Sequence, residues 1–274
     1  TALHTASGLD PRGNGKRGNL TVFAEIYEGE TDPGALAPKF VVSSSALTEN
    51  VRELAELPRE IMLETDFSDT GKIKDVLQQR RIGMEQSFAN AGHAAAMARL
   101  TSYFLPAGVV RQQPGGVDFH RFLVELPDTF DDRAAELAQR LNEVAHRLFD
   151  GSNLLVSIAG SDECVMRFWQ CAGITAGTGK APAALKIPKP KVRNEAFIVP
   201  TDVCYAAQGF DPRADGAPYT GAWQAAARAL SYDFLWNAVR VTGGAPAAGL
   251  RPTRPGTLRL HSSTHPPLAP HHTP

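Results

Sequence analysis

Histidine is the residue type in this chain best suited to metal binding and proton transfer, and the chain contains eight histidines. They are His4, His93, His120, His146, His261, His265, His271 and His272. None lies in an H-E-x-x-H sequence or in its inverse, H-x-x-E-H, the patterns that place two zinc ligands on one helix. His261 and His265 are four residues apart, but prolines follow closely, so no helix is expected to hold that spacing. We therefore predict no metal site in this chain.

Other catalytic patterns are also missing from the sequence. There is no G-x-S-x-G elbow, and "GTGK" at 177–180 lacks the frame of a phosphate-binding loop. The carboxylates lie on expected helix faces, and no pair of them can be assigned acid–base work. His93 follows Gly92 in an alanine-rich helix, so we interpret it as a packing residue, with a polar contact across a close helix crossing as the alternative. We predict no catalytic residue.

One short segment retains chemical interest, the stretch "VRVTGGA" at 239–245. Arg240 carries five N–H donors that suit a carboxylate or backbone carbonyls. Gly243 and Gly244 allow a close backbone approach and a positive φ. These three residues are the candidate substrate-binding residues, and an ordinary turn after a helix is the alternative interpretation.

The composition excludes several protein classes. The chain has 274 residues, of which 43% are hydrophobic and 21% charged, with a formal net charge of −1 and scattered cations. A nucleic-acid groove needs a concentrated basic face, so we expect no nucleic-acid partner. No apolar run is long enough to span a bilayer, and no secretion leader is evident, so we expect no membrane partner. Three cysteines, Cys164, Cys171 and Cys204, are too few for a disulfide framework, which predicts a cytoplasmic chain.

The hydrophobic periodicity predicts an α+β fold, with helices layered on a mixed β-sheet. The expected strands are 20–27, 39–45, 153–160, 195–200 and 202–209. The expected helices are 46–63, 70–104, 131–151 and 220–241. Residues 106–116 are expected to form a loop, and 117–126 are consistent with either a helix or a strand.

Composition also suggests how the chain is divided. A noncatalytic α+β domain is expected over 1–172, followed by a Gly-, Pro- and Lys-rich linker over 173–194. Residues 195–245 look like the start of a second α+β unit. Residues 246–274 hold many prolines and histidines and no aromatic residue, so they are expected to form an irregular tail. The chain starts with Thr1 rather than Met, which suggests an excised or processed piece.

Four separated blocks resemble the C-terminal half of presequence-protease and falcilysin-type enzymes, zinc metallopeptidases of the pitrilysin/insulysin superfamily. The resemblance covers roughly residues 20–250. The blocks occur in the family's order and read "ETDFSD" (64–69), "GMEQSFANAGHAAAMARLTSYF" (83–104), "NEAFIVPTDVCYAAQG" (194–209) and "YDFLWNAVRVTGGA" (232–245).

The resemblance implies a third domain over 1–172 and the start of a fourth domain over 195–245. In the family, four related domains form two bowl-shaped halves around an unfolded peptide, and the zinc ligands and catalytic glutamate belong to the first domain. The fourth domain carries an R-x-x-G-G-A-Y-G pattern that binds substrate. Here Arg240, Gly243, Gly244 and Ala245 match that pattern, but Pro246 stands where the family has tyrosine.

The implied function is the noncatalytic peptide-chamber portion of a zinc-dependent endopeptidase that degrades unfolded peptides. Zinc is implied for the intact enzyme and not for this chain. The implied partners are an N-terminal zinc-bearing half or partner chain and an unfolded peptide, with self-association through exposed strand edges. An inactive homologue or separate peptide-binding subunit is the first alternative. A free-standing α+β interaction domain is the second.

Overall fold

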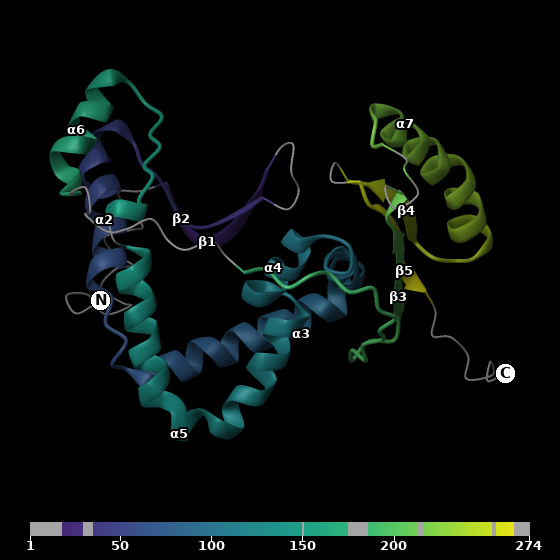
Figure 1. Ribbon diagram of the computed structural model, residues 1–274, viewed down its shortest axis with the longest axis horizontal. Coiled ribbons are helices and arrows are strands. Elements are labelled where there is room, and N and C mark those ends of the chain that lie inside the picture. Colours follow the sequence, from purple (N-terminus) through teal and green to yellow (C-terminus); the bar gives the residue numbers. More distant parts are fainter. Residues whose placement is uncertain are drawn as a thin grey trace. The chain divides into compact units, whose positions relative to one another are not determined.

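Figure 1 shows the computed structural model of the chain. The structure describes residues 18–29, 35–149, 151–174, 186–212, 216, 218–253 and 256–265. His4, His271, His272 and the central part of the expected linker, residues 175–185, lie outside the described residues.

The chain divides into two compact units, each described here by itself. Unit 1 is built from Thr1–Glu25, Pro38–Val76 and Pro127–Leu185. Unit 2 is built from Ile26–Ala37, Leu77–Leu126 and Lys186–Pro274. Helices and two small antiparallel sheets are both present, which confirms the α+β class and corrects the expectation of a mixed sheet.

The core of unit 1 is formed by α2 (Val51–Glu64) and α6 (Asp162–Ala172), which lie side by side in Figure 1. The buried side chains between them are Val51, Ala55, Phe168 and Ala172. The start of α6 is capped by the Ser161 hydroxyl, which accepts the Cys164 N–H at 3.4 Å. Burial therefore explains this helix pair, although α6 was not predicted from the sequence.

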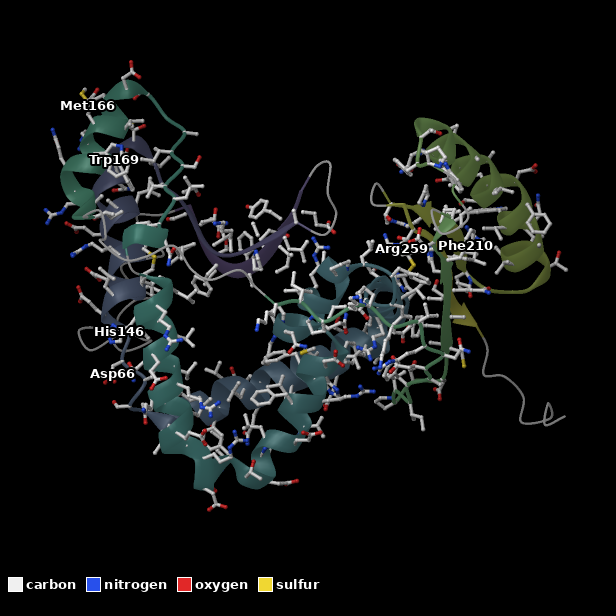
Figure 2. All side chains as sticks on the ribbon, in the orientation of Figure 1. Asp66, His146, Met166, Trp169, Phe210 and Arg259 are labelled. Carbon is white, nitrogen blue, oxygen red and sulfur yellow. The ribbon has the colours of Figure 1, made fainter. Side chains whose placement is uncertain are left out.

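A strand expected at 153–160 does not form, because no partner strand lies beside it in the described residues. Instead, Val156 and Ile158 pack against the α2–α6 core from an irregular segment. The opposite face of α6 exposes Met166 and Trp169, which project outward in Figure 2.

Strands β1 (Asn19–Glu28) and β2 (Leu36–Ser45) form the two-stranded sheet that the sequence predicts. They are followed by a 3-10 turn, η1 (Thr48–Asn50), which leads into α2. Both strands alternate β-branched and aromatic residues, as half-buried strands do.

Three helices form the helical part of unit 2. They are the later part of α3 (Thr70–Thr101), α4 (Pro106–Gly115) and the first turns of α5 (Val117–Leu148). The expected loop at 106–116 is wrong, because Pro106 occupies the first helical turn, where a missing N–H costs nothing. The two segments expected on either side of residue 127 form the single helix α5. A 3-10 turn, η2 (Gly151–Asn153), follows it.

The second sheet has the strand order β3–β5–β4 and is antiparallel. Its strands are β3 (Cys204–Phe210), β4 (Ala247–Pro252) and β5 (Leu258–His265). The prediction of an irregular tail is therefore wrong for residues 247–252 and 258–265. Prolines did not prevent pairing because Pro252 stands at the end of β4, on an edge strand.

One side of this sheet packs against α7 (Gly221–Leu230) and η4 (Ser231–Thr242), as Figure 1 shows. The Ser231 hydroxyl joins helix and sheet, because it donates to the Ala227 carbonyl at 2.6 Å and accepts the Leu250 N–H at 2.9 Å. Residues 195–200, expected to form a strand, have none of the ladder pairing of a strand. No helix in the described residues is long and apolar enough to cross a bilayer.

Candidate functional site

The candidate residue Arg240 lies near the end of η4, which is a π-helix continuous with α7. Wide turns of this kind are rare and occur frequently at functional sites. The side chains support the wider turn, because the Thr242 hydroxyl donates to the Asn237 carbonyl five residues earlier, at 3.0 Å. The sequence predicts a helix here, and it does not predict the π geometry.

Four exposed side chains form an alternating row of cations and aromatic rings along α7 and η4, which we call the ladder: Arg228, Tyr232, Trp236 and Arg240. The Arg240 guanidinium lies 3.9 Å above the centre of the Trp236 ring. The Trp236 ring stacks on Tyr232 with 6.5 Å between centroids, and Arg228 lies 5.6 Å from the Tyr232 centre. Each member is four residues from the next, so all four share one side of the helix.

The Arg240 side chain is exposed, and among the described residues it has no hydrogen bond or ion pair. Stacking uses the flat face of the guanidinium and leaves the in-plane N–H donors available. The site can therefore donate two parallel hydrogen bonds to a carboxylate or to carbonyl oxygens.

Gly243 and Gly244 end the π-helix. The N–H groups of both glycines point to the Arg240 carbonyl, and the Ala245 N–H donates to the Val239 carbonyl at 3.1 Å. Gly244 has φ of +71°, and a Cβ on Gly243 would lie 2.7 Å from the Val239 carbonyl oxygen. Both glycines are thus required by the helix end, whatever they do for a substrate.

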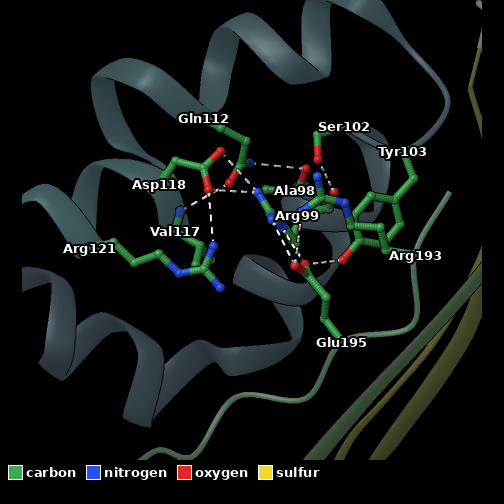
Figure 3. Close-up of polar contacts among 10 residues, drawn as sticks. All are labelled: Ala98, Arg99, Ser102, Tyr103, Gln112, Val117, Asp118, Arg121, Arg193 and Glu195. Carbon is green, nitrogen blue, oxygen red and sulfur yellow. Dashed lines mark hydrogen bonds and ion pairs between the residues drawn. The ribbon is translucent and has the colours of Figure 1, made fainter. Parts of the chain in front are cut away.

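A second polar cluster surrounds Arg99 in unit 2 (Figure 3). The buried guanidinium binds both carboxylate oxygens of Glu195, at 2.6 and 3.0 Å. Its Nη1 donates to both oxygens of Asp118, each at 3.0 Å. The Tyr103 hydroxyl also donates to Glu195.

The charges in this cluster shift its ionisation. Hydrogen bonds from Arg99 lower the pKa of Glu195 to about 2, against the opposing effect of burial. The hydrogen bond with Glu195 raises the pKa of Arg99 above its already high value. Every group in the cluster is thus held in its ionised or bonded form, which is typical of a structural anchor rather than of an acid–base catalyst.

Two imidazoles meet where α3 packs on the second sheet. His93 of α3 and His261 of β5 stack with 6.0 Å between ring centroids. Nδ1 of each ring is buried without a hydrogen-bond partner in the described residues. Burial lowers the pKa of His261, and the nearby charge of Arg251 lowers it further. The structure thus places His93 in a packing contact, as the sequence indicated, and adds His261 to it.

Residues 1–126 match the profile of a family described as the region associated with peptidase family M16, subfamily C. "Protein HypA" of Clostridium perfringens is 28% identical over 83% of this chain and 24% of its own length. "Presequence protease 1, chloroplastic/mitochondrial" of Arabidopsis thaliana is 25% identical over 84% of this chain and 22% of its own length. "Presequence protease, mitochondrial" of Yarrowia lipolytica is 27% identical over 77% of this chain and 22% of its own length.

The chain is related to the C-terminal part of presequence protease-type M16 peptidases. It spans about a quarter of the length of these M16 relatives. This relation supports a peptidase-related, noncatalytic part, in agreement with the four sequence blocks.

The described residues do not fit the zinc of an M16 peptidase. No group of three or more His, Cys, Asp or Glu side chains comes together among them. His93 and His261 are the two imidazoles that meet, and they stack face to face in a site beside the cations Arg251 and Arg259. A cationic surrounding disfavours a metal ion.

Sequence reasoning missed the cluster and the ladder that surround the candidates in this M16 relative. Arg99 and Glu195 are 96 residues apart, and no local pattern connects them. The ladder did have a signal, because arginines and aromatic rings recur every fourth residue from 228 to 240. The three cysteines, Cys164, Cys171 and Cys204, are free thiols.

Proposed function

We propose that this chain is the noncatalytic peptide-chamber portion of a zinc-dependent endopeptidase that degrades unfolded peptides. The observation that carries the proposal is the free Arg240 guanidinium, held on Trp236 at the end of a helix whose "VRVTGGA" segment matches the family pattern. The relation to presequence proteases supports the same conclusion.

In this proposal Arg240 binds the peptide, and the Gly243–Gly244 turn lets the peptide backbone pass close to the helix end. A Cβ on Gly244 would meet no atom within 4 Å, so space is open beside it. Extended peptides bind such surfaces mainly through backbone hydrogen bonds. Pro246 offers no phenolic donor, so the tyrosine contact of the family pattern is absent from this position.

The zinc of the proposed endopeptidase is carried by an N-terminal half or by a separate partner chain. The zinc activates the water that attacks the peptide bond. Since the described residues offer no fitting ligand set, this chain contributes binding and enclosure to that reaction. The cytoplasmic compartment expected from three unpaired cysteines stays a prediction, and several relatives are named mitochondrial or chloroplastic.

The test is the binding of a fluorescent unstructured peptide to the 274-residue chain, measured by anisotropy. Arg240→Ala is expected to weaken binding about threefold to fivefold, the effect of one exposed charged contact. Arg133→Ala on α5 is the control, because Arg133 is exposed and lies in the other unit. No measurable binding to the unaltered chain would overturn the proposal.

The second candidate is an inactive homologue or separate subunit that binds peptides or a zinc-bearing chain. Pro246 in place of the family tyrosine favours it, since removing one such donor costs roughly 10²–10³ in rate. Purification from the native source distinguishes the two: a separate partner carrying H-x-x-E-H favours the subunit, and one long polypeptide favours the chamber portion.

A further inference from the structure

We propose that the ladder of Arg228, Tyr232, Trp236 and Arg240 selects extended peptide segments that carry acidic side chains, and that Trp236 positions Arg240 for this contact. The proposal rests on the peptide-binding function proposed above and adds the class of peptide. The bound group is the carboxylate of a Glu or Asp side chain within the peptide.

The geometry of the ladder prepares Arg240 for a carboxylate. The guanidinium lies flat over Trp236 at 3.9 Å, so the ring restricts its side-chain rotation. A planar guanidinium that stacks on an aromatic face keeps its N–H edge directed outward, in the geometry that matches a carboxylate bidentately. Trp236 is therefore a positioning residue, and Arg240 is the binding residue.

The charge around the ladder favours an acidic partner. Between Gly216 and Pro274 the sequence contains five arginines and no lysine, with Asp233 as its one acidic residue, hence a formal net charge of +4. The whole chain has a net charge of −1, so positive charge is concentrated in this segment. Asp233 immediately follows Tyr232, and adjacent helical residues do not face the same side, so it lies off the ladder.

Neither arginine of the ladder is neutralised within the described residues. No carboxylate lies within ion-pair distance of Arg228 or Arg240 there, and both side chains are exposed. The rings between them are also open to solvent, with 65% of Tyr232 and 40% of Trp236 exposed. An acidic peptide would supply both the missing charge and apolar cover.

The length of the ladder sets the spacing of the acidic side chains. Arg228 and Arg240 are twelve residues apart, which corresponds to at most roughly 18 Å along an α-helix. An extended peptide rises about 3.4 Å per residue, so about five residues span that distance. Contact with both arginines therefore requires acidic residues inside the peptide, about five positions apart, rather than one terminal carboxylate.

The test compares two labelled ten-residue peptides that differ at two positions five residues apart, Glu in one and Gln in the other, by anisotropy at low salt. We expect the Glu peptide to bind the unaltered chain about fivefold to tenfold tighter. Trp236→Leu and Arg240→Ala should each lower this ratio to about threefold or less, while Trp236→Phe keeps most of it. Arg251→Ala is the control, because it removes an exposed cation of the same segment outside the ladder.

The ratio between the two peptides separates recognition from general damage, because a destabilised variant loses affinity for both peptides equally. Equal affinities for the two peptides, an equal loss of the ratio in Arg251→Ala, or tighter binding of a single-stranded oligonucleotide would each overturn this inference. No binding of either peptide would contradict the proposed function itself. A ratio that depends on Trp236 and Arg240 supports both.

Discussion

Arg99 joins two parts of the chain that are 96 residues apart, because its guanidinium binds the Glu195 carboxylate with two hydrogen bonds. Glu195 belongs to the segment that leads from the expected linker to β3. The anchor therefore fixes the path by which the chain enters the second sheet. Buried arginine–carboxylate pairs of this geometry are strongly destabilised when one partner is removed.

At the residue scale we predict that Glu195→Gln destabilises the chain by about 2 kcal/mol at pH 7 and flattens its acid response. The pKa of Glu195 is about 2 in the folded chain, below its ordinary value of 4.5. Its contribution is thus complete above about pH 4.5 and is lost as the pH falls toward 2.

Urea unfolding at pH 7, 4 and 3 measures this effect. The difference in stability between the unaltered chain and Glu195→Gln should shrink as the pH falls. Glu136→Gln, which changes an exposed ion pair on α5, is the matched control. A difference that stays constant from pH 7 to 3 would show that the anchor does not depend on ionised Glu195.

The sequence could predict single candidate residues but not their surroundings. Arg240 and its two glycines follow from a local pattern, and the structure shows them at one helix end. Their part in substrate binding stays a prediction. The Arg99 cluster depends on tertiary contacts between distant residues, which no local spacing encodes.

Helix α3 packs on β3 through a break in its own backbone. Ala91 has non-helical angles (φ −139°, ψ 43°), and the Tyr205 hydroxyl donates to the nearby Ala89 carbonyl at 2.7 Å. A Cβ on Gly92 would lie 2.3 Å from the Tyr205 ring. The strand thus supplies a hydrogen bond to a carbonyl at the break, and the glycine makes room for the ring.

At the element scale, Gly92→Ala is therefore expected to destabilise the chain by about 1–3 kcal/mol, through overpacking against Tyr205. Gly83→Ala on the same helix is the control, because a Cβ there meets nothing within 4 Å. That change should stabilise the chain by up to about 1 kcal/mol, the helix preference of alanine over glycine. Thermal unfolding of both variants checks the pair, and equal shifts in the same direction would refute the contact.

The stacked histidines should make the α3–sheet contact sensitive to pH. His261 is 9% exposed and faces His93 on α3, Arg251 on β4 and Arg259 on its own strand. Burial, followed by the charge of Arg251, holds the pKa of His261 below its ordinary 6.5. The unfolded chain therefore binds this proton more readily, so stability falls as the pH drops below about 6.5.

The measurement is the urea midpoint at pH 7.5 and at pH 5.5. His261→Phe keeps the ring stack without the titration, so its midpoint should fall less than that of the unaltered chain. His146→Gln on α5 is the control, because that side chain is exposed and in the other unit. An unchanged pH response in His261→Phe would exclude this histidine as the source.

Elements with long, regular periodicity were predictable, and those that depend on partners were not. The sequence predicts β1, β2, α2, α3, β3 and the α7–η4 helix close to where they occur. It gives 153–160 and 195–200 as strands because they are apolar, yet neither finds a pairing partner in the described residues. The tail strands β4 and β5 were missed because their prolines suggested a loop.

At the scale of the whole chain, many large apolar side chains remain exposed in both units. Leu155 and Ile198 are 85% and 104% exposed, and Val192 and Val241 exceed two thirds. Exposed apolar surface of this extent promotes association. We predict an apparent mass above 29.4 kDa that rises with concentration in light scattering. Ile198→Ser should reduce the rise, and a constant monomer mass would contradict the prediction.

The central claim is that this chain binds unfolded peptides without cleaving them. Its most direct test is mass spectrometry of a labelled peptide incubated with the 274-residue chain and zinc, with and without a chelator, after anisotropy has shown binding. We predict that the bound peptide stays intact under both conditions. Peptide fragments that appear with zinc and disappear with the chelator would contradict the account.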